Sequence, residues 1–179
     1  MKSLLIGCGS NLTKQFSSND IFEWDELVTL DINKDHNPNV VHDLMDFPYP
    51  FEDNTFDEIH AYDVLEHTGQ QGDYRFFFRQ WDEFYRILKP GGFFFGSCPT
   101  ATSVWAWGDP SHTRVISKEN LVFLSQVFYT QEVGNTAASD FRYIYKSDFD
   151  ALAIPSESVD SFKFMLHAVK PSRIESKYA

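Results

Sequence analysis

Residues 3–11, SLLIGCGSN, begin with a short apolar run that breaks at two glycines. A continuous apolar run of this length is typical of a parallel strand buried on both faces. Glycine then lets the backbone pass close to a ligand that a Cβ atom would push away. We therefore predict a strand over Ser3–Ile6 and a ligand-approach loop over Gly7, Cys8 and Gly9, although a plain strand-to-loop turn would give the same pattern.

Further strands and helices alternate along the chain beyond this loop. Apolar runs predict four more strands, at Leu27–Ile32, Asn39–Leu44, Phe56–Val64 and Phe93–Ser97. Apolar residues at a 3.6-residue period predict a helix over Tyr74–Leu88, ended by the proline and glycines of residues 90–92. Two less regular helices are expected, one within residues 12–25 and one over Lys118–Phe128 with Ser117 as its cap. This alternation predicts an α/β fold with a mainly parallel sheet.

The last part of the chain has a different pattern. Two strand candidates, Phe141–Lys146 and Phe162–Val169, lie on either side of a polar connection with little helical periodicity. We expect them to form an antiparallel pair at one edge of the sheet. No repeat, low-complexity tract or linker interrupts the sequence, so we expect residues 1–179 to form a single domain.

Charge and composition narrow the partners. The 179 residues include 15 Lys plus Arg and 26 Asp plus Glu, a net charge of −11, so nucleic acid is not an expected partner. No apolar run approaches the roughly 18 residues of a membrane span, and the first run is too short for a signal peptide. Cys8 and Cys98 form neither a disulfide framework nor a zinc ligand set. We therefore expect a cytoplasmic protein without membrane contact.

Aspartates stand at the predicted ends of the second and third strands, where open α/β sheets bind ligands. Asp31 follows Gly9 by 22 residues, close to the offset of about 20 at which a carboxylate meets ribose hydroxyls. Asp43 is placed to accept a hydrogen bond from an exocyclic amino group, while the next amide, that of Leu44, donates to a ring nitrogen. Solvated or turn-capping aspartates are the structural alternative. The histidines and acids of residues 35–46 fit no standard ligand spacing, and we expect no metal site.

Residues 56–67, FDEIHAYDVLEH, and residues 88–92, LKPGG, complete an ordered set of motifs. Together with the glycine loop and the two aspartates, they resemble the class I S-adenosylmethionine-dependent methyltransferases of the type 11 domain kind over roughly residues 3–98. Residues 109–114, DPSHTR, are similar to an Asp-Pro-Thr-His segment of many relatives. The resemblance implies a Rossmann-like fold with a mainly parallel seven-stranded sheet and an antiparallel strand near the C-terminus.

The resemblance also implies S-adenosyl-L-methionine as the cofactor. By position, it assigns cofactor binding to Gly7, Cys8, Gly9, Asp31, Ile32, Asp43, Leu44, Tyr62 and Asp63. The glycine loop would pass under the methionine part, the acid after the second strand would hold the ribose, and the acid after the third would frame the adenine. Leu5 and Asn11 depart from the family, which often has an acid and a third glycine there. Asp63 or the loop backbone would then contact the cofactor amino group.

The implied reaction moves the methyl group to an oxygen or nitrogen of an unidentified acceptor. His67 and His112 are the candidate general bases, because histidine titrates near neutrality; each has a structural alternative, holding its own loop. The segments after the fourth and fifth strands are short, which predicts an open site for a large or extended acceptor, or a site completed by a second subunit. Phe76 and Ile87 lie off the apolar face of their predicted helix and suggest a homodimer.

Two other functions are compatible with this pattern. A nicotinamide (NAD)-dependent oxidoreductase uses a similar sheet and a similar ribose acid, but it favours a third glycine where this chain has Leu12. A methyltransferase-like module without turnover would bind the cofactor and transfer nothing.

Overall fold

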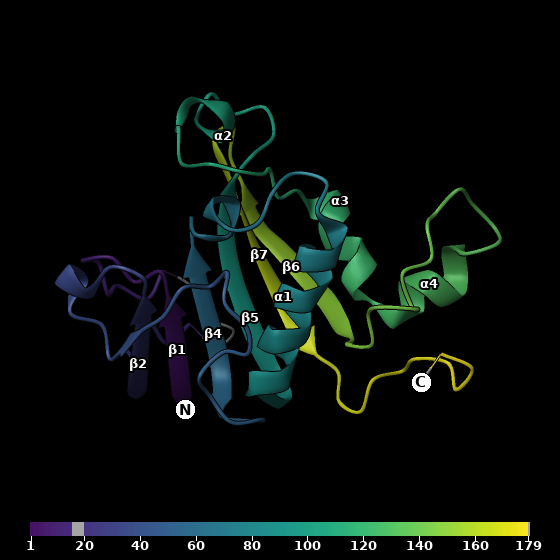
Figure 1. Cartoon of the computed structure of the whole chain (residues 1–179), viewed down its shortest axis with the longest axis horizontal. Helices are drawn as coiled ribbons and strands as arrows, with labels where there is room; N and C mark the ends of the chain where they lie inside the picture. The colour runs from purple at the N-terminus through teal and green to yellow at the C-terminus, as the bar shows by residue number, and fades with distance from the viewer. Residues whose placement is uncertain (16–19, 179) are drawn as a thin grey trace.

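The computed structural model describes residues 1–15 and 20–178, and only the backbone of residues 152–157 (Figure 1). Its centre is one seven-stranded sheet in the order β3-β2-β1-β4-β5-β7-β6. The strands are β1 (Lys2–Ile6), β2 (Glu26–Asp31), β3 (Val40–Val41), β4 (Phe56–Tyr62), β5 (Leu88–Pro99), β6 (Phe149–Glu157) and β7 (Ser161–Ala168). The first five pair in parallel, and β7 runs antiparallel to both β5 and β6. The α/β fold with antiparallel strands near the C-terminus is thereby confirmed.

The helices are few and mostly short. They are α1 (Tyr74–Ile87), α2 (Trp105–Gly108), α3 (Lys118–Leu121) and α4 (Gln126–Glu132), with the 3-10 turns η1 (Lys34–His36), η2 (Leu65–His67) and η3 (Val122–Leu124). In Figure 1, α1 crosses the same face of the sheet on which α3 lies. None of the helices in the described residues has the length and apolar character that crossing a bilayer requires.

Aromatic packing between α1 and the sheet forms the core. The Asp73 carboxylate accepts the Phe76 amide and so caps the helix, as an N-cap aspartate does. Trp81 and Phe84 on the buried face of α1 each meet the ring of Phe94 on β5, with centroids 4.8 Å apart. Much of the phenylalanine content of the chain is therefore core that fixes α1 on the sheet.

The irregular helix expected within residues 12–25 is absent from the described part of that segment, 12–15 and 20–25; residues 16–19 lie outside the described residues. Asn11 accepts the amide of Thr13 in a local turn, and Lys14 leaves the solvent to pair with Glu58 on β4. These two interactions hold the start of the segment in a non-helical path, and the helical prediction was wrong for the described residues 12–15 and 20–25.

The third strand is shorter than predicted and the fifth is longer, and two later segments differ in kind from the sequence prediction. Residues 141–146 form turns because the side chain of Tyr145 is fully buried and its hydroxyl donates to Leu124, so the edge strand is β6 instead. The helix expected over Lys118–Phe128 breaks at Ser125, where the backbone is extended and the next amide donates to Asp148. Tertiary hydrogen bonds override the local pattern at both places.

Of the two residues that suggested a homodimer, Ile87 is buried and Phe76 is half-buried. Ile87 is completely buried in the core, which corrects the expectation that it lies off the apolar face. The ring of Phe76 packs at a tilt against Phe47, with centroids 5.5 Å apart, and the guanidinium of Arg114 lies over the Phe76 ring. The buried position of Ile87 therefore gives no support for a subunit contact.

Candidate functional site

A pocket of about 140 Å³ lies beyond the carboxyl ends of β1 and β2. Of the residues assigned to cofactor binding, its lining includes Gly7, Asp31, Ile32, Asp43 and Leu44. These residues come from three loops that follow three neighbouring strands. The sheet topology thus brings together groups that the sequence separates by up to 37 positions.

Asp31 is held by the backbone on both of its carboxylate oxygens. Oδ2 accepts the amide of Gly9 at 2.8 Å, and Oδ1 accepts the amide of Asn33 at 2.7 Å. His36 lies 3.3 Å from Oδ2. Burial opposes ionisation, but the hydrogen bonds from Asn33, Gly9 and His36 outweigh it and hold the pKa of Asp31 below its usual value. The carboxylate is therefore an ionised acceptor with a fixed orientation.

The loop after β3 presents the second acid. One oxygen of Asp43 accepts the amide of Met45 at 2.8 Å, which fixes the carboxylate in a turn. Leu44 is buried beside it, whereas Ile32 across the pocket is exposed.

Both loop glycines have a left-handed backbone, but the space around them differs. A Cβ atom on Gly7 would lie 2.4 Å from a methyl carbon of Val64, so this glycine is required by packing. A Cβ on Gly9 would meet nothing within 4 Å. Cys8 between them is buried, its thiol near Thr29 rather than in the lining of the pocket.

Tyr62 is the last residue of β4 and Asp63 follows it, and their side chains have different partners. The hydroxyl of Tyr62 accepts the amide of Gln15 and lies 2.6 Å from Nδ1 of His60. Asp63 has a left-handed backbone, and its carboxylate accepts the hydroxyl of Ser97 at 3.1 Å. Asp63 thus sits between the ends of β4 and β5, and the Tyr62 hydroxyl belongs to a separate group of polar residues.

That group, the buried polar cluster, lies on the sheet face opposite α1. It consists of Ser3, Lys14, Glu58, His60 and Tyr62, joined by hydrogen bonds through the carboxylate of Glu58 and the ring of His60. Burial opposes the charge on Glu58, yet His60 and Lys14 lower its pKa to about 2. Burial in turn lowers the pKa of His60. Sequence reasoning missed this cluster because Lys14 meets Glu58 only in the folded sheet.

The structure brings His67 and His112 together, with ring centroids 4.5 Å apart. Nδ1 of His67 lies 3.0 Å from the Ser111 hydroxyl, and Nε2 of His112 lies 3.9 Å from Asp109. Burial and the neighbouring His112 lower the pKa of His67. Because His67 also lines the pocket, the pair stands at its rim.

Glu66 joins this pair and was missed by the sequence reading, although it directly precedes His67 in the motif. Its carboxylate is buried and has no hydrogen-bond partner among the described residues. Burial raises the pKa of Glu66 to about 7. Ligating atoms of Glu66, His67 and His112 all lie within 4.8 Å of one another.

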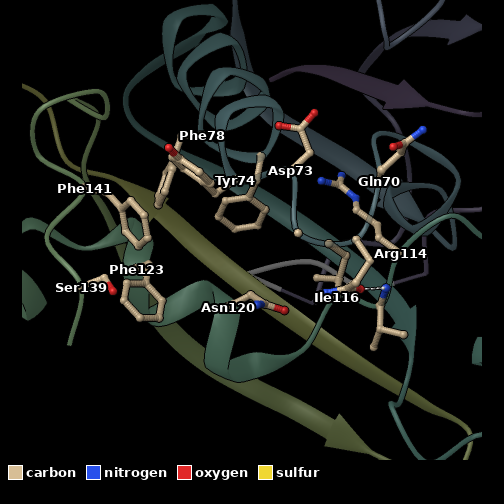
Figure 2. A pocket seen from close by; sticks show the side chains of 14 residues that line it. Gln70, Asp73, Tyr74, Phe78, Arg114, Ile116, Asn120, Phe123, Ser139 and Phe141 are labelled. Atoms are coloured by element: carbon tan, nitrogen blue, oxygen red, sulfur yellow. Dashed lines mark hydrogen bonds between the residues drawn. The ribbon is translucent and has the colours of Figure 1, made fainter. Parts of the chain in front are cut away.

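A second pocket of about 260 Å³ lies between the start of α1 and the segment after β5. Figure 2 shows aromatic rings from Tyr74, Phe78, Phe123 and Phe141 on one side of it and polar groups on the other. Arg114 reaches its polar side, but the guanidinium is buried and donates to Leu65, Thr68 and Gln80.

Comparison with known proteins identifies the family and the fold. A family profile described as a methyltransferase domain matches residues 4–96, slightly more than half of the chain. No curated protein sequence is significantly similar to the chain.

Solved structures match almost the whole chain. A SAM-dependent methyltransferase from Archaeoglobus fulgidus is 19% identical, with 93% of this chain and 85% of that chain covered and a TM-score of 0.58. The N-methyltransferase NodS from Bradyrhizobium japonicum, in complex with S-adenosyl-L-homocysteine, is 15% identical, with 93% and 77% covered and a TM-score of 0.53.

The CurJ carbon methyltransferase is 14% identical, with 95% of this chain and 49% of that chain covered and a TM-score of 0.53. At these identities the likeness shows a shared fold, and enzymes with this fold methylate different atoms. The profile match to residues 4–96 decides the family: the chain belongs to the methyltransferase domain family.

Proposed function

We propose that this chain is an S-adenosyl-L-methionine-dependent methyltransferase that acts on an oxygen or nitrogen nucleophile of its acceptor. When bound, the cofactor supplies a methyl group activated on a sulfonium sulfur. The chain's own residues then have mainly to align acceptor and methyl group, because proximity and orientation account for much of such a rate. The buried free thiols of Cys8 and Cys98 favour a reducing compartment, the cytoplasm.

The fixed carboxylate of Asp31 is the observation on which this proposal rests. Oδ1 accepts one backbone amide and retains a further lone pair for a ribose hydroxyl, whereas Oδ2 accepts the Gly9 amide and also faces His36, which a second ribose hydroxyl would have to displace. Gly9 leaves open space where a side chain would stand. Asp43 and the buried Leu44 then frame the adenine end of the pocket. These residues fit the cofactor.

The same geometry argues against an NAD-dependent oxidoreductase. Dinucleotide sites place pyrophosphate at the N-terminus of a helix that follows the glycine loop. The described residues after this loop, 10–15, contain no helix, and Lys14 is committed to Glu58. A bound pyrophosphate would lack both the amides and the dipole that normally hold it.

The acceptor would lie on the side of His67 and His112. Two chain segments run together from this pair to the aromatic pocket of Figure 2: the Thr113 amide donates to Glu66, and the Gln71 amide donates to Thr113. The aromatic pocket accordingly takes an apolar or aromatic part of the acceptor, and the remainder of a large or extended acceptor stays outside it.

The test combines cofactor binding with label transfer. At a hundredfold excess over its Kd, S-adenosylhomocysteine should stabilise the protein by about 2.7 kcal/mol and raise its Tm by roughly 5–10 °C, with no effect of NAD. Labelled S-adenosylmethionine, used below the Kd of the wild-type chain, should then label one fraction of a host extract, and Asp31→Ala should label the same fraction about ten- to a hundredfold more weakly. A response to NAD alone would overturn the proposal, and cofactor binding without label in any fraction would indicate a module that has no turnover.

A further inference from the structure

We propose that Glu66, His67 and His112 form a binding site for a divalent transition-metal ion at the rim of the cofactor pocket. One carboxylate and two imidazoles are a donor set typical of Zn²⁺ and of other first-row divalent ions. The three side chains converge from η2 and from the segment after β5, and their ligating atoms lie within 4.8 Å of one another. Metal bonds of about 2.0–2.2 Å place ligand atoms roughly 3–4 Å apart, so small side-chain rotations would close the site.

The carboxylate of Glu66 is the strongest argument for a cation. Glu66 is only 2% exposed; the buried Cys98 thiol interacts with its carboxylate, but neither carboxylate oxygen makes a hydrogen bond of normal geometry among the described residues. Buried polar groups are nearly always paired, and a carboxylate without a partner carries a large desolvation cost. The nearby guanidinium of Arg114 attracts the Glu66 carboxylate through its charge, but it donates its hydrogen bonds to Leu65, Thr68 and Gln80.

The imidazole of His112 provides a second, independent indication. Its side chain is 8% exposed, and its buried Nδ1 has no partner among the described residues. The other nitrogen, Nε2, faces Asp109 at 3.9 Å. A histidine with one nitrogen toward a carboxylate and the other free has the arrangement of a metal ligand with its outer partner.

Asp109 also orients the other histidine. It accepts the hydroxyl of Ser111, and that hydroxyl lies 3.0 Å from Nδ1 of His67. Nε2 of His67 is then the nitrogen left to ligate. One aspartate thus supports both rings, which is how outer-sphere carboxylates fix the rotation and tautomer of metal-binding histidines.

The sequence predicted no metal among the histidines and acids of residues 35–46, and it gave no sign of this group, because His112 follows His67 by 45 positions. With three protein ligands, such a site keeps a position open for a water or an oxygen of another molecule. Under the function proposed above, that position would hold an oxygen of the methyl acceptor. The histidines would then act as ligands rather than as free bases.

The experiment measures metal binding by the full chain, separately from activity. After removal of metals with a chelator, Zn²⁺ is titrated calorimetrically, and Co²⁺ serves as the spectroscopic probe. We expect one equivalent of each, with visible Co²⁺ absorption. Glu66→Gln and His112→Ala should each weaken Zn²⁺ binding at least tenfold, and Asp109→Asn about 10–100-fold. The control His167→Ala, on β7, should change nothing.

A measurement on the wild-type chain tests the same site if the variants fail to fold. Substoichiometric Co²⁺ should broaden the ring NMR signals of His67 and His112 before those of the other four histidines. The proposal is overturned by the absence of stoichiometric binding, by unchanged affinity in folded variants, or by broadening that begins at His36 or His42. Binding of S-adenosylhomocysteine, measured on the same samples, shows separately whether the proposed function stands.

Discussion

The amide of Gly9 donates a 2.8 Å hydrogen bond to Oδ2 of Asp31, which joins the loop after β1 to the end of β2. The glycine loop and the strand-end acid are therefore one structural unit and not two separate contacts. The position of the glycine loop depends on the charge of Asp31.

Asp31→Ala should weaken binding of S-adenosylhomocysteine about ten- to a hundredfold, measured by calorimetry. The substitution removes a charged acceptor for two hydroxyl donors, and hydrogen bonds to charged groups are worth about 1.5–3 kcal/mol. Asp35→Ala is the matched control. It removes the same charge from an exposed side chain that lies four positions further along the chain. Equal affinities for the wild type and Asp31→Ala would remove Asp31 from the cofactor site.

Gly7→Ala should destabilise the protein more than Gly9→Ala. Both glycines have a left-handed backbone, which costs an L-residue about 1–2 kcal/mol, but only at Gly7 does the new Cβ collide with Val64. Adding Val64→Ala should recover part of the stability of Gly7→Ala and none of that of Gly9→Ala. Urea unfolding of the three single and two double variants gives the comparison. Identical losses at the two glycines would show that packing against Val64 does not matter.

Lys14→Met should reduce the free energy of unfolding at pH 7 by about 3–5 kcal/mol, because it leaves the buried carboxylate of Glu58 without its cation. The double variant Lys14→Met/Glu58→Gln should regain most of that loss.

The pH dependence of the same pair has a defined sign. The pKa of Glu58 is about 2 in the folded chain, below its usual 4.5. Its ionisation therefore stabilises the fold above about pH 4.5, and this contribution is lost as the pH falls from 4.5 toward 2. The difference between wild type and Lys14→Met should shrink over that range. A difference that stays constant down to pH 3 would contradict the role of the ion pair.

Asp82→Asn should stabilise the protein at pH 8 by about 1–2 kcal/mol and leave it unchanged near pH 4. Burial raises the pKa of Asp82 to about 6, so its ionisation costs stability as the pH rises from about 4 to 6. Asparagine keeps the acceptor for the Ser147 hydroxyl and carries no charge. Differential scanning calorimetry at both pH values tests this, and a variant less stable at pH 8 would contradict it.

The central part of the fold could be predicted because its signals are local. The 3.6-residue period of Tyr74–Ile87, the glycines after β1 and the aspartates after β2 and β3 each reflect constraints within a few residues. Parallel strands then align their carboxyl ends at one edge of the sheet, so the predicted cofactor residues Gly7, Asp31 and Asp43 meet in one pocket.

Long-range contacts decided the rest. The described residues 10–15 form no helix because Lys14 pairs with Glu58. Residues 141–146 form no strand because Tyr145 is buried. Neither partner can be identified from the local pattern, since the free energy comes from burial and charge pairing that exist only in the folded chain.

The sequence by itself determined the α/β fold, the glycine loop and the acid at the end of β2, because periodicity, turn chemistry and strand order are written within short windows. Only the tertiary structure placed His112 against His67 and buried Glu66 beside them. The physical reason is distance along the chain: 45 positions separate the two histidines, and only the pairing of β4 with β5 carries the loops after these strands to the same edge of the sheet.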